Sequence, residues 1–256
     1  MPIDPLAERA FGTRADDYER HRAEWPGEAV ESALQGAGAG PASAVVDLAA
    51  GTGKLTRALV PRVARVIAVE PSAGMRRQLA ERVPEAEIHE GTAESIPLGD
   101  ASVDAVLVGE AFHWFSTREA VEEIARVVRP GGGVALLWNA HDFGGDPWVR
   151  AMGELIDARR APGVTPINRK HTGLWKTAFE GSPFEPLQLF QTRHEQRTDV
   201  DGLVAHIATW SFVGALEDEP RAALMRDLGD LLRREHPSPN DVAIPYRTDV
   251  YWARRL

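Results

Sequence analysis

The sequence predicts an α/β fold built on a doubly wound sheet of seven strands. Between residues 44 and 139, short apolar segments alternate with helical ones, as expected for parallel strands that are buried on both faces and joined by helices. Glycine-rich turns follow several of these segments. Two later segments alternate apolar and polar residues, which is typical of antiparallel strands. We therefore expect a sheet that is parallel except for a C-terminal antiparallel strand.

Each predicted element rests on its local pattern. β-branched apolar runs predict strands, and apolar residues at helical spacing predict helices. Ser116 followed by Glu119 predicts a capping box before the fourth helix, and Pro130 with the glycines that follow predicts the turn that ends it. The predicted strands cover residues 44–48, 63–70, 86–91, 102–109, 134–139, 186–197 and 246–255, and the predicted helices 28–34, 54–62, 71–83, 117–128, 145–160, 171–181, 201–213 and 217–236.

The composition narrows the chemistry available to the chain. Its 256 residues are 43% hydrophobic, which suits a single globular domain with a full core. The absence of cysteine excludes disulfides, thiolate nucleophiles, zinc–thiolate sites and iron–sulfur clusters. The histidines are scattered over different predicted elements, with no two at metal-ligand spacing, so we expect no metal site.

Charge and hydropathy limit the partners. With 38 acidic and 29 basic residues the formal charge is -9, which argues against binding of long stretches of nucleic acid. The first residues, MPIDPLAERAFG, carry charges where a secretory signal would be apolar, and no apolar run approaches membrane-spanning length. We expect a cytoplasmic protein, a monomer or homodimer, with neither nucleic acid nor a membrane as partner.

The loop after the first strand is the first candidate ligand site. Its sequence from Asp47 to Gly53, DLAAGTG, joins a strand to a helix, where glycines let a ligand approach the backbone closely. A phosphate-binding P-loop would need a lysine followed by serine or threonine after a longer gap, which Lys54-Leu55 does not supply. A dinucleotide-binding loop would normally have a third glycine near position 56. This chain has Thr56 there, which disfavours NAD as the ligand.

Glu70 is the second candidate, at the end of the second strand. A carboxylate there can accept hydrogen bonds from both hydroxyls of a ribose. The alternative is that Glu70 caps the helix that starts at Pro71, because acidic groups favour helix N-termini. Its position in the fold favours the ribose.

Several motifs together resemble the class I S-adenosylmethionine-dependent methyltransferases. VVDLAAGTGKLT resembles the first motif of that family and VIAVEPSAGM the second. EGTAESIPLGDASVDAVLVGEAFHWF resembles the third and fourth, and RVVRPGGGVALLWN the turn and strand that follow. The motifs occur in the family's order between Ala44 and Asn139, with Ala49 where many members have glycine. The resemblance implies a Rossmann-like fold, and S-adenosylmethionine as cofactor with S-adenosylhomocysteine as its product.

The resemblance also implies roles for individual residues. Asp47 would hold the amine of the methionine part, through water or directly, and Glu70 would bind the ribose. Met75 would lie beside the adenine, and Ala93 and Glu94 would belong to the loop that reads its edge. The implied cofactor-binding residues are Tyr18, Arg22, Asp47, Ala49, Gly51, Gly53, Glu70, Pro71, Met75, Thr92, Ala93, Glu94, Gly109 and Glu110.

The AFHWF segment after the fourth strand particularly resembles the subgroup that includes trans-aconitate methyltransferase. His113 is the candidate base because neutral imidazole titrates near working pH; the alternative is that His113 and Trp114 are structural, since methyl transfer to a carboxylate needs no base. Glu110 stands where that subgroup more often has glutamine. The alternatives are that its carboxylate changes what is bound near the sulfonium or that it is merely solvated, and we favour the second. The implied substrate pocket consists of His113, Trp114, Trp148 and Trp175, with one of the last two lining it.

We interpret residues 1–256 as a single domain. Segment 1–40 would cover the cofactor, 41–142 bind it, 143–182 form a helical lid insertion and 183–256 complete the sheet. Arg169-Lys170 in the insertion is the best placed pair for an anionic acceptor.

The expected activity is methyl transfer to a hydroxyl, carboxylate, amine or carbon of a small molecule, by in-line displacement that depends mainly on positioning, with or without a base. An NAD-dependent oxidoreductase and a non-catalytic cofactor-binding module stay open as alternatives.

Overall fold

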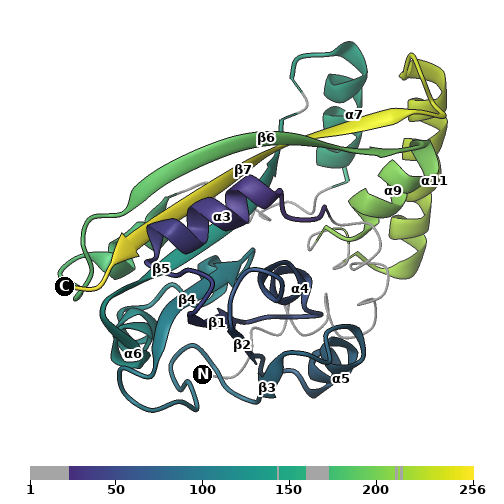
Figure 1. Ribbon diagram of the computed structural model, residues 1–256. Helices are drawn as coiled ribbons and strands as arrows, with labels where there is room; N and C mark the ends of the chain where they lie inside the picture. Colours follow the sequence, from purple (N-terminus) through teal and green to yellow (C-terminus); the bar gives the residue numbers. More distant parts are fainter. Residues whose placement is uncertain (1–22, 143, 160–172, 211–212, 214–215) are drawn as a thin grey trace.

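The computed structural model describes residues 23–142, 144–159, 173–210, 213 and 216–256. Its centre is a seven-stranded sheet of order β3-β2-β1-β4-β5-β7-β6 (Figure 1). β7 is antiparallel to both of its neighbours, whereas β1 to β5 pair in parallel. This confirms the predicted sheet. The strands are β1 (Ala44–Leu48), β2 (Arg65–Val69), β3 (Glu87–His89), β4 (Val103–Gly109), β5 (Val128–His141), β6 (Gln188–Thr198) and β7 (Val242–Arg254).

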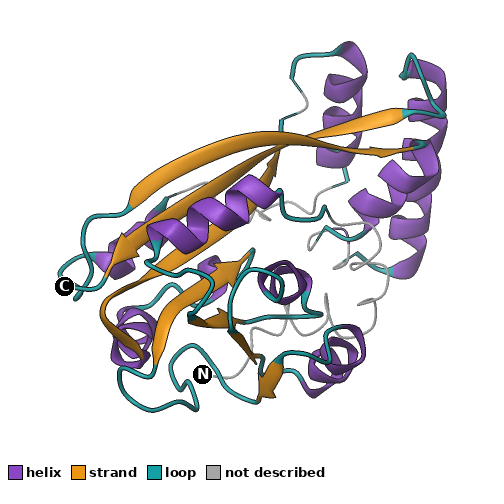
Figure 2. Cartoon of the chain, in the orientation of Figure 1, coloured by secondary structure: helices purple, strands orange, loops and turns teal. Residues whose placement is uncertain are grey.

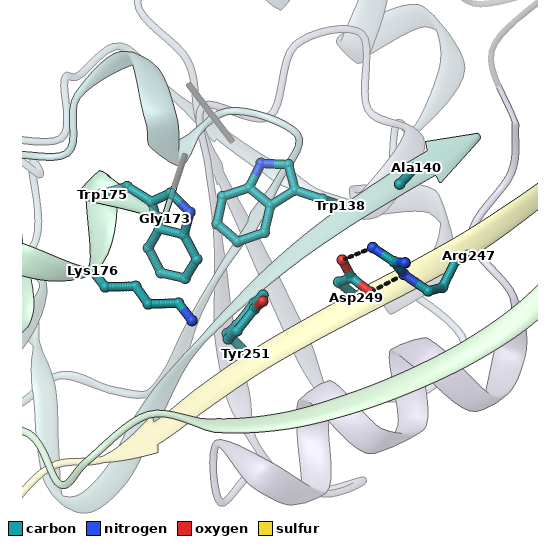
Figure 3. Close-up of a pocket in the computed structure, with 8 residues that line it drawn as sticks. All are labelled: Trp138, Ala140, Gly173, Trp175, Lys176, Arg247, Asp249 and Tyr251. Carbon is teal, nitrogen blue, oxygen red and sulfur yellow. Dashed lines mark hydrogen bonds and ion pairs between the residues drawn. The ribbon is translucent and has the colours of Figure 1, made fainter. Parts of the chain in front are cut away.

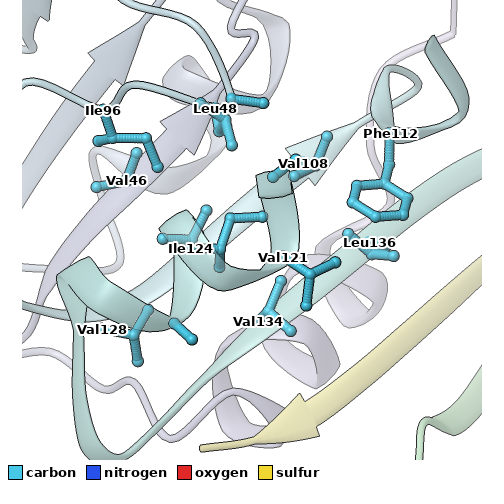
Figure 4. Close-up of a cluster of buried hydrophobic side chains, with 14 of the residues drawn as sticks. Val46, Leu48, Ile96, Val108, Phe112, Val121, Ile124, Val128, Val134 and Leu136 are labelled. Atoms are coloured by element: carbon cyan, nitrogen blue, oxygen red, sulfur yellow. The ribbon is translucent and has the colours of Figure 1, made fainter. Parts of the chain in front are cut away.

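Helices cover both faces of the sheet, as Figure 2 shows. α3 and α4 pack on one face, and α6 with the 3-10 helix η2 packs on the other. Figure 4 shows part of the α6 face, where Val121 and Ile124 contact apolar residues of the central strands. The helices are α3 (Gly27–Gly36), α4 (Lys54–Leu59), α5 (Ala73–Arg82), α6 (Arg118–Val127), α7 (Pro147–Asp157), α9 (Val200–Ala208) and α11 (Asp218–Glu235), with the 3-10 helices η1 (Phe112–Trp114) and η2 (Leu174–Phe179).

A second body of apolar side chains lies beyond the edge of the parallel strands. β6 and β7 are long, and together they extend to α7, α9 and α11 (Figure 1). Trp148 of α7, Leu203 of α9 and Leu228 of α11 are buried in one cluster with Val242 and Ile244 of β7. The ribbon of β6 and β7 therefore joins two hydrophobic cores. The described helices of the predicted insertion 143–182 divide between them, α7 in this cluster and η2 on the sheet.

Two local predictions are wrong at the ends of α6. The N-cap is Thr117, whose hydroxyl accepts a hydrogen bond from the Ala120 amide at 3.2 Å. The helix therefore starts one residue later than a cap at Ser116 requires, which leaves Glu119 at the second helical position, where it cannot complete a capping box. The helix ends at Val127 and β5 begins at the next residue, so Gly131 to Gly133 lie in the strand.

Among the described residues, no helix has both the length and the apolarity needed to cross a bilayer.

Candidate functional site

The carboxyl ends of β1, β2 and β4 meet at one edge of the sheet, where the loop after β1 turns into α4. We call this the cofactor edge: residues 47–53, Glu70 and Gly109. The loop has left-handed backbone at three positions, Ala49 (φ 59°), Gly51 (58°) and Gly53 (95°). Glycine adopts this conformation without cost, whereas Ala49 bears a steric penalty from its Cβ. Ala49, which stands where many members of the family have glycine, is therefore strained.

The two glycines of this loop face different surroundings. A Cβ added at Gly53 would lie 3.2 Å from both Leu79 and Val83, so this glycine permits close packing of α5. A Cβ added at Gly51 would have, among the described residues, only the sulfur of Met75 within reach, at 4.0 Å. The backbone of Gly51 therefore borders open space beside an apolar side chain, as a closely approaching ligand requires.

Asp47 lies beneath the loop and is only 1% exposed. Its carboxylate accepts a hydrogen bond from the Thr56 hydroxyl at 2.6 Å. Burial raises the pKa of Asp47 to about 7, hydrogen bonds from Thr56 act in the opposite direction, and the charge of Glu70 adds to the rise. Thr56, which weakened the case for a dinucleotide loop, thus holds the first carboxylate in place. A buried carboxyl that titrates near neutrality marks a candidate functional site.

Glu70 supports the same loop from the end of β2. One carboxylate oxygen accepts a hydrogen bond from the Gly51 amide at 3.0 Å and the other from the Ser72 amide at 2.8 Å. Burial raises the pKa of Glu70, and the two backbone hydrogen bonds and Arg76 oppose that rise. The alternative that Glu70 caps the next helix is wrong, because α5 begins at Ala73 and its N-cap is Ser72, whose hydroxyl accepts a hydrogen bond from the Met75 amide. The hydrogen bond from the Ser72 amide holds the Glu70 carboxylate in place just before the helix. It does not compete with ribose binding, because each carboxylate oxygen can accept further hydrogen bonds.

The residues implied for the adenine lie on two segments, the turn at residues 92–95 and the start of α5. Thr92 and Ser95 form a tight turn through two backbone hydrogen bonds of 3.2 Å. Ala93 at the turn is buried and Glu94 half-buried. Met75, in the first turn of α5, borders Gly51 as described above, and its neighbour Pro71 is half-buried. The structure thus brings Met75 and Pro71 to the cofactor edge beside Glu70.

Gly109 ends β4, and Glu110 follows it. A Cβ at Gly109 would lie 2.9 Å from the ring of Trp25, so a larger residue would collide there. Glu110 has left-handed backbone (φ 59°), and its carboxylate accepts a hydrogen bond from the Asn139 amide at 2.6 Å. The side chain is half-buried and ties the end of β4 to β5. The expectation of a merely solvated Glu110 is therefore wrong.

His113 lies in η1, just beyond this junction. Its Nδ1 accepts a hydrogen bond of 3.3 Å from the indole nitrogen of Trp138 in β5, and its ring lies 5.0 Å from that of Trp114. A neutral imidazole that accepts at Nδ1 has its proton on Nε2. In this tautomer, assigned from the hydrogen bond, Nε2 is a donor and not a base. The arrangement favours the structural alternative for His113.

Trp138 also lines a pocket of about 180 Å³ on the α6 face of the sheet (Figure 3). We call it the aromatic pocket. Asp249 in its wall is buried and accepts hydrogen bonds from Arg247, at 2.8 and 3.1 Å, and from Gln191 at 2.8 Å. The pocket is lined by Trp138, Ala140, Gly173, Trp175, Lys176, Arg247, Asp249 and Tyr251.

Trp148 and Trp175, both predicted for the substrate pocket, lie in different parts of the molecule. Trp175 lines the aromatic pocket, whereas Trp148 is buried in the cluster of α7, α9 and α11, with its ring 4.7 Å from that of His236. Tyr18 and Arg22, together with the pair Arg169-Lys170, lie outside the described residues.

Sequence reasoning missed a group of rings at the end of β5. Nε2 of His141 lies 2.7 Å from Nε2 of His206 in α9, and the ring of Tyr246 in β7 is 4.9 Å from that of His141. The two histidines are 65 positions apart, so no spacing rule could pair them. In the part of the chain that the structure describes, no three His, Asp or Glu side chains gather so as to hold a metal ion.

Known methyltransferases resemble this chain in sequence and in fold. Residues 46–136 match the family model described as methyltransferase domain. An uncharacterised methyltransferase of Mycobacterium bovis is 36% identical over 244 residues, which cover 93% of each chain. A solved structure from Anaeromyxobacter dehalogenans, provisionally described as a type II methyltransferase, shares the fold with a TM-score of 0.72 at 24% identity, over 91% of this chain and 97% of that one.

A third match is a structure of geranyl diphosphate methyltransferase in complex with S-adenosylmethionine. It has a TM-score of 0.51 at 15% identity and covers 100% of this chain and 93% of that one. Its fold is thus shared by a protein that binds this cofactor.

Proposed function

The chain belongs to the S-adenosylmethionine-dependent methyltransferases, and from this premise we propose that it methylates a small molecule at the edge where β4 and β5 end. The observation that carries the proposal is the pair of buried carboxylates, Asp47 and Glu70, on either side of a loop whose Gly51 borders open space. Two buried acidic groups of raised pKa are costly unless a cationic or hydroxyl-bearing ligand completes the site.

The residues of the cofactor edge fit S-adenosylmethionine. Glu70 can accept hydrogen bonds from the ribose of the cofactor, and Met75 offers an apolar surface to its adenine. Asp47 supplies negative charge near the amine of its methionine part. When bound, this cofactor supplies a methyl group already activated on a sulfonium. The protein then has to place the acceptor atom in line and exclude water, and positioning of this kind is worth roughly 7–11 kcal/mol.

The AFHWF segment, residues 111–115, supports the proposal that the acceptor is a small molecule and that the chain belongs to the trans-aconitate methyltransferase subgroup. In the structure this segment joins β4 to α6 and contains η1, and Trp138 holds His113 from the neighbouring strand. We assign His113 as a positioning residue that keeps this wall of the site in place.

Cofactor binding and methyl transfer test the proposal. S-adenosylhomocysteine at a hundredfold excess over Kd should add about 2.7 kcal/mol of stability and raise the melting temperature, whereas NADH should not. Incubation with methyl-labelled S-adenosylmethionine and a small-molecule extract should place label in a small organic product. A rise with NADH alone, or label only in the macromolecular fraction, would contradict the proposal.

His113→Ala separates the two roles of the histidine once the extract has given an acceptor. A general base contributes typically 10²- to 10⁴-fold. If His113 is a positioning residue, its replacement should lower kcat by less than about tenfold. The pH profile and the affinity for S-adenosylhomocysteine should not change. His89→Ala, on β3 away from this wall, is the matched control. A loss of a hundredfold or more together with a vanished basic limb in the pH profile would establish His113 as the base.

A further inference from the structure

We propose that the aromatic pocket is a subsite for the methyl acceptor and that it binds one anionic group, a carboxylate or a phosphate, at Lys176. The inference rests on the proposed function, because it takes the acceptor to be a small molecule. It adds the charge of that molecule and the residue that recognises it.

Among the residues that the structure describes, the charged side chains lining the pocket leave one cation, Lys176, without an ion pair. Asp249 is paired with Arg247 through two hydrogen bonds, which Figure 3 shows as dashed lines. Lys176 makes no ion pair within the described part of the chain. Its ammonium lies instead over the ring of Tyr251, 4.7 Å from the centroid, and 5.6 Å from that of Trp175. In a protein of net charge -9, a lysine held on aromatic faces is a docking point for an anion.

The pocket adjoins the edge at which methyl transfer is proposed. Trp138 forms part of its wall, and the indole nitrogen of the same residue donates to His113 beyond the end of β4. In the sheet, Gly109 of β4 pairs with Leu137, the residue before Trp138. The pair His113 and Trp138 therefore connects the wall of the pocket to the end of β4. A molecule bound at Lys176 can extend past Trp138 toward the cofactor edge.

Size and lining define the group that fits. A volume of about 180 Å³ corresponds to about six water molecules, less than the pocket that a whole ligand usually occupies. Trp138, Trp175 and Tyr251 form one aromatic wall, with ring centroids 4.7 to 5.9 Å apart. The pocket thus suits an anionic head on an apolar or planar body, and the rest of the acceptor lies outside it.

A probe pair that differs only in charge tests the subsite. We would titrate phenylacetate, phenyl phosphate and neutral phenylacetamide into the protein saturated with S-adenosylhomocysteine, by calorimetry and by tryptophan fluorescence. At least one anion should bind tenfold or more tightly than the amide. Lys176→Met should remove this preference, Lys176→Arg should retain it, and Arg197→Gln, which removes an exposed cation on β6, should leave it unchanged.

The same samples separate failure of the subsite from failure of the proposed function. The rise in melting temperature with S-adenosylhomocysteine should be equal in the wild type and in Lys176→Met, and its absence in the wild type would refute the function. The subsite is refuted if neither anion binds at 10 mM, if the amide binds as well as the anions, or if Lys176→Met binds them unchanged. A preference for phenyl phosphate would identify the group as a phosphate, and a preference for phenylacetate as a carboxylate.

Discussion

The cofactor edge and the aromatic pocket stand on either side of the pair His113 and Trp138, and they carry opposite charge. The cofactor edge buries two carboxylates, Asp47 and Glu70, and burial raises the pKa of both, although Arg76 opposes the rise at Glu70. The aromatic pocket neutralises its own carboxylate with Arg247 and keeps Lys176 in addition. Under the two proposals, the neighbouring sites select for opposite ligand charges, which disfavours binding of each ligand at the other site.

The sites also differ in how the chain builds them. The cofactor edge comes from consecutive strand–loop–helix units between residues 47 and 110, whereas the aromatic pocket combines β5, η2 and β7, which are far apart in the sequence. If the sites are as separate as this suggests, a change in one should leave ligand binding to the other intact. The following variants test that independence.

The largest effect is expected from Glu70→Ala. It removes the acceptor for the Gly51 and Ser72 amides and the proposed ribose contacts. Charge-assisted hydrogen bonds are worth roughly 1.5–3 kcal/mol, so affinity for S-adenosylhomocysteine should fall roughly 10- to 150-fold in calorimetry. Binding of the anionic probe should not change. Glu87→Ala, an exposed glutamate on β3, is the control. A fall of less than threefold would refute the proposed role of Glu70, and loss of both ligands would refute independent sites.

A smaller effect concerns pH and Asp47. With a pKa of about 7, the carboxyl is mostly protonated at pH 6 and ionised at pH 8, so cofactor affinity that requires the ionised form should rise about tenfold over this range. Asp47→Asn should remove this rise, and the ratio of the two affinities isolates the carboxyl from the ligand's own amine. Probe binding at the aromatic pocket provides the comparison. If the ratio of the wild-type and Asp47→Asn affinities did not change with pH, the ionisation of Asp47 would not contribute to cofactor binding.

The same residue has a consequence for folding stability. Because its folded pKa lies above the unfolded value of 3.8, the folded chain binds a proton that the unfolded chain releases. The stabilisation is fully present below about pH 4 and is lost as the pH rises toward 7. Chemical denaturation should therefore show that the free energy of unfolding of the wild type falls between pH 5 and pH 7.5. In Asp47→Asn the fall over the same range should be smaller.

The smallest effect is expected from Ala49→Gly. Left-handed backbone costs a residue with a Cβ roughly 1–2 kcal/mol, partly offset because glycine has more freedom to lose on folding. The variant should gain up to about 1 kcal/mol of stability, and affinity for S-adenosylhomocysteine should stay within threefold. Ala50→Gly, next to it and without a positive φ, should instead lose about 0.5–1 kcal/mol. Destabilisation by both glycines would mean that Ala49 is not strained.

Much of the fold was predictable because the parallel strands are buried on both faces and short. β1, β2 and β4 each carry at least four buried residues in succession, and such runs stand out from amphipathic helices. The extent of β5 was not predictable. Gly131 to Gly133 read as a turn, but Gly133 pairs with Ala105 and with Arg254, and a partner near the end of the chain has no local signal.

The same distinction applies to the candidate site. The loop residues 47–53 and Glu70 could be found because their spacing follows from one strand–loop–helix unit. Trp175 could be proposed as a pocket residue, but Lys176, Tyr251 and Trp138 could not be placed around it, because their contact depends on the register of β7 against β5. Glu110 was misjudged because its role lies in a hydrogen bond to Asn139 on another strand.

The insertion of β7 between β5 and β6 sets the order in which the protein can be completed on the ribosome. β5 ends at His141 and β6 at Thr198, but the strand that pairs with both begins only at Val242. Until that segment has been synthesised, two strand edges wait unpaired, exposed to other nascent chains. The five parallel strands can form during translation, whereas the aromatic pocket, which needs Arg247, Asp249 and Tyr251, can form only after residue 251 has been synthesised.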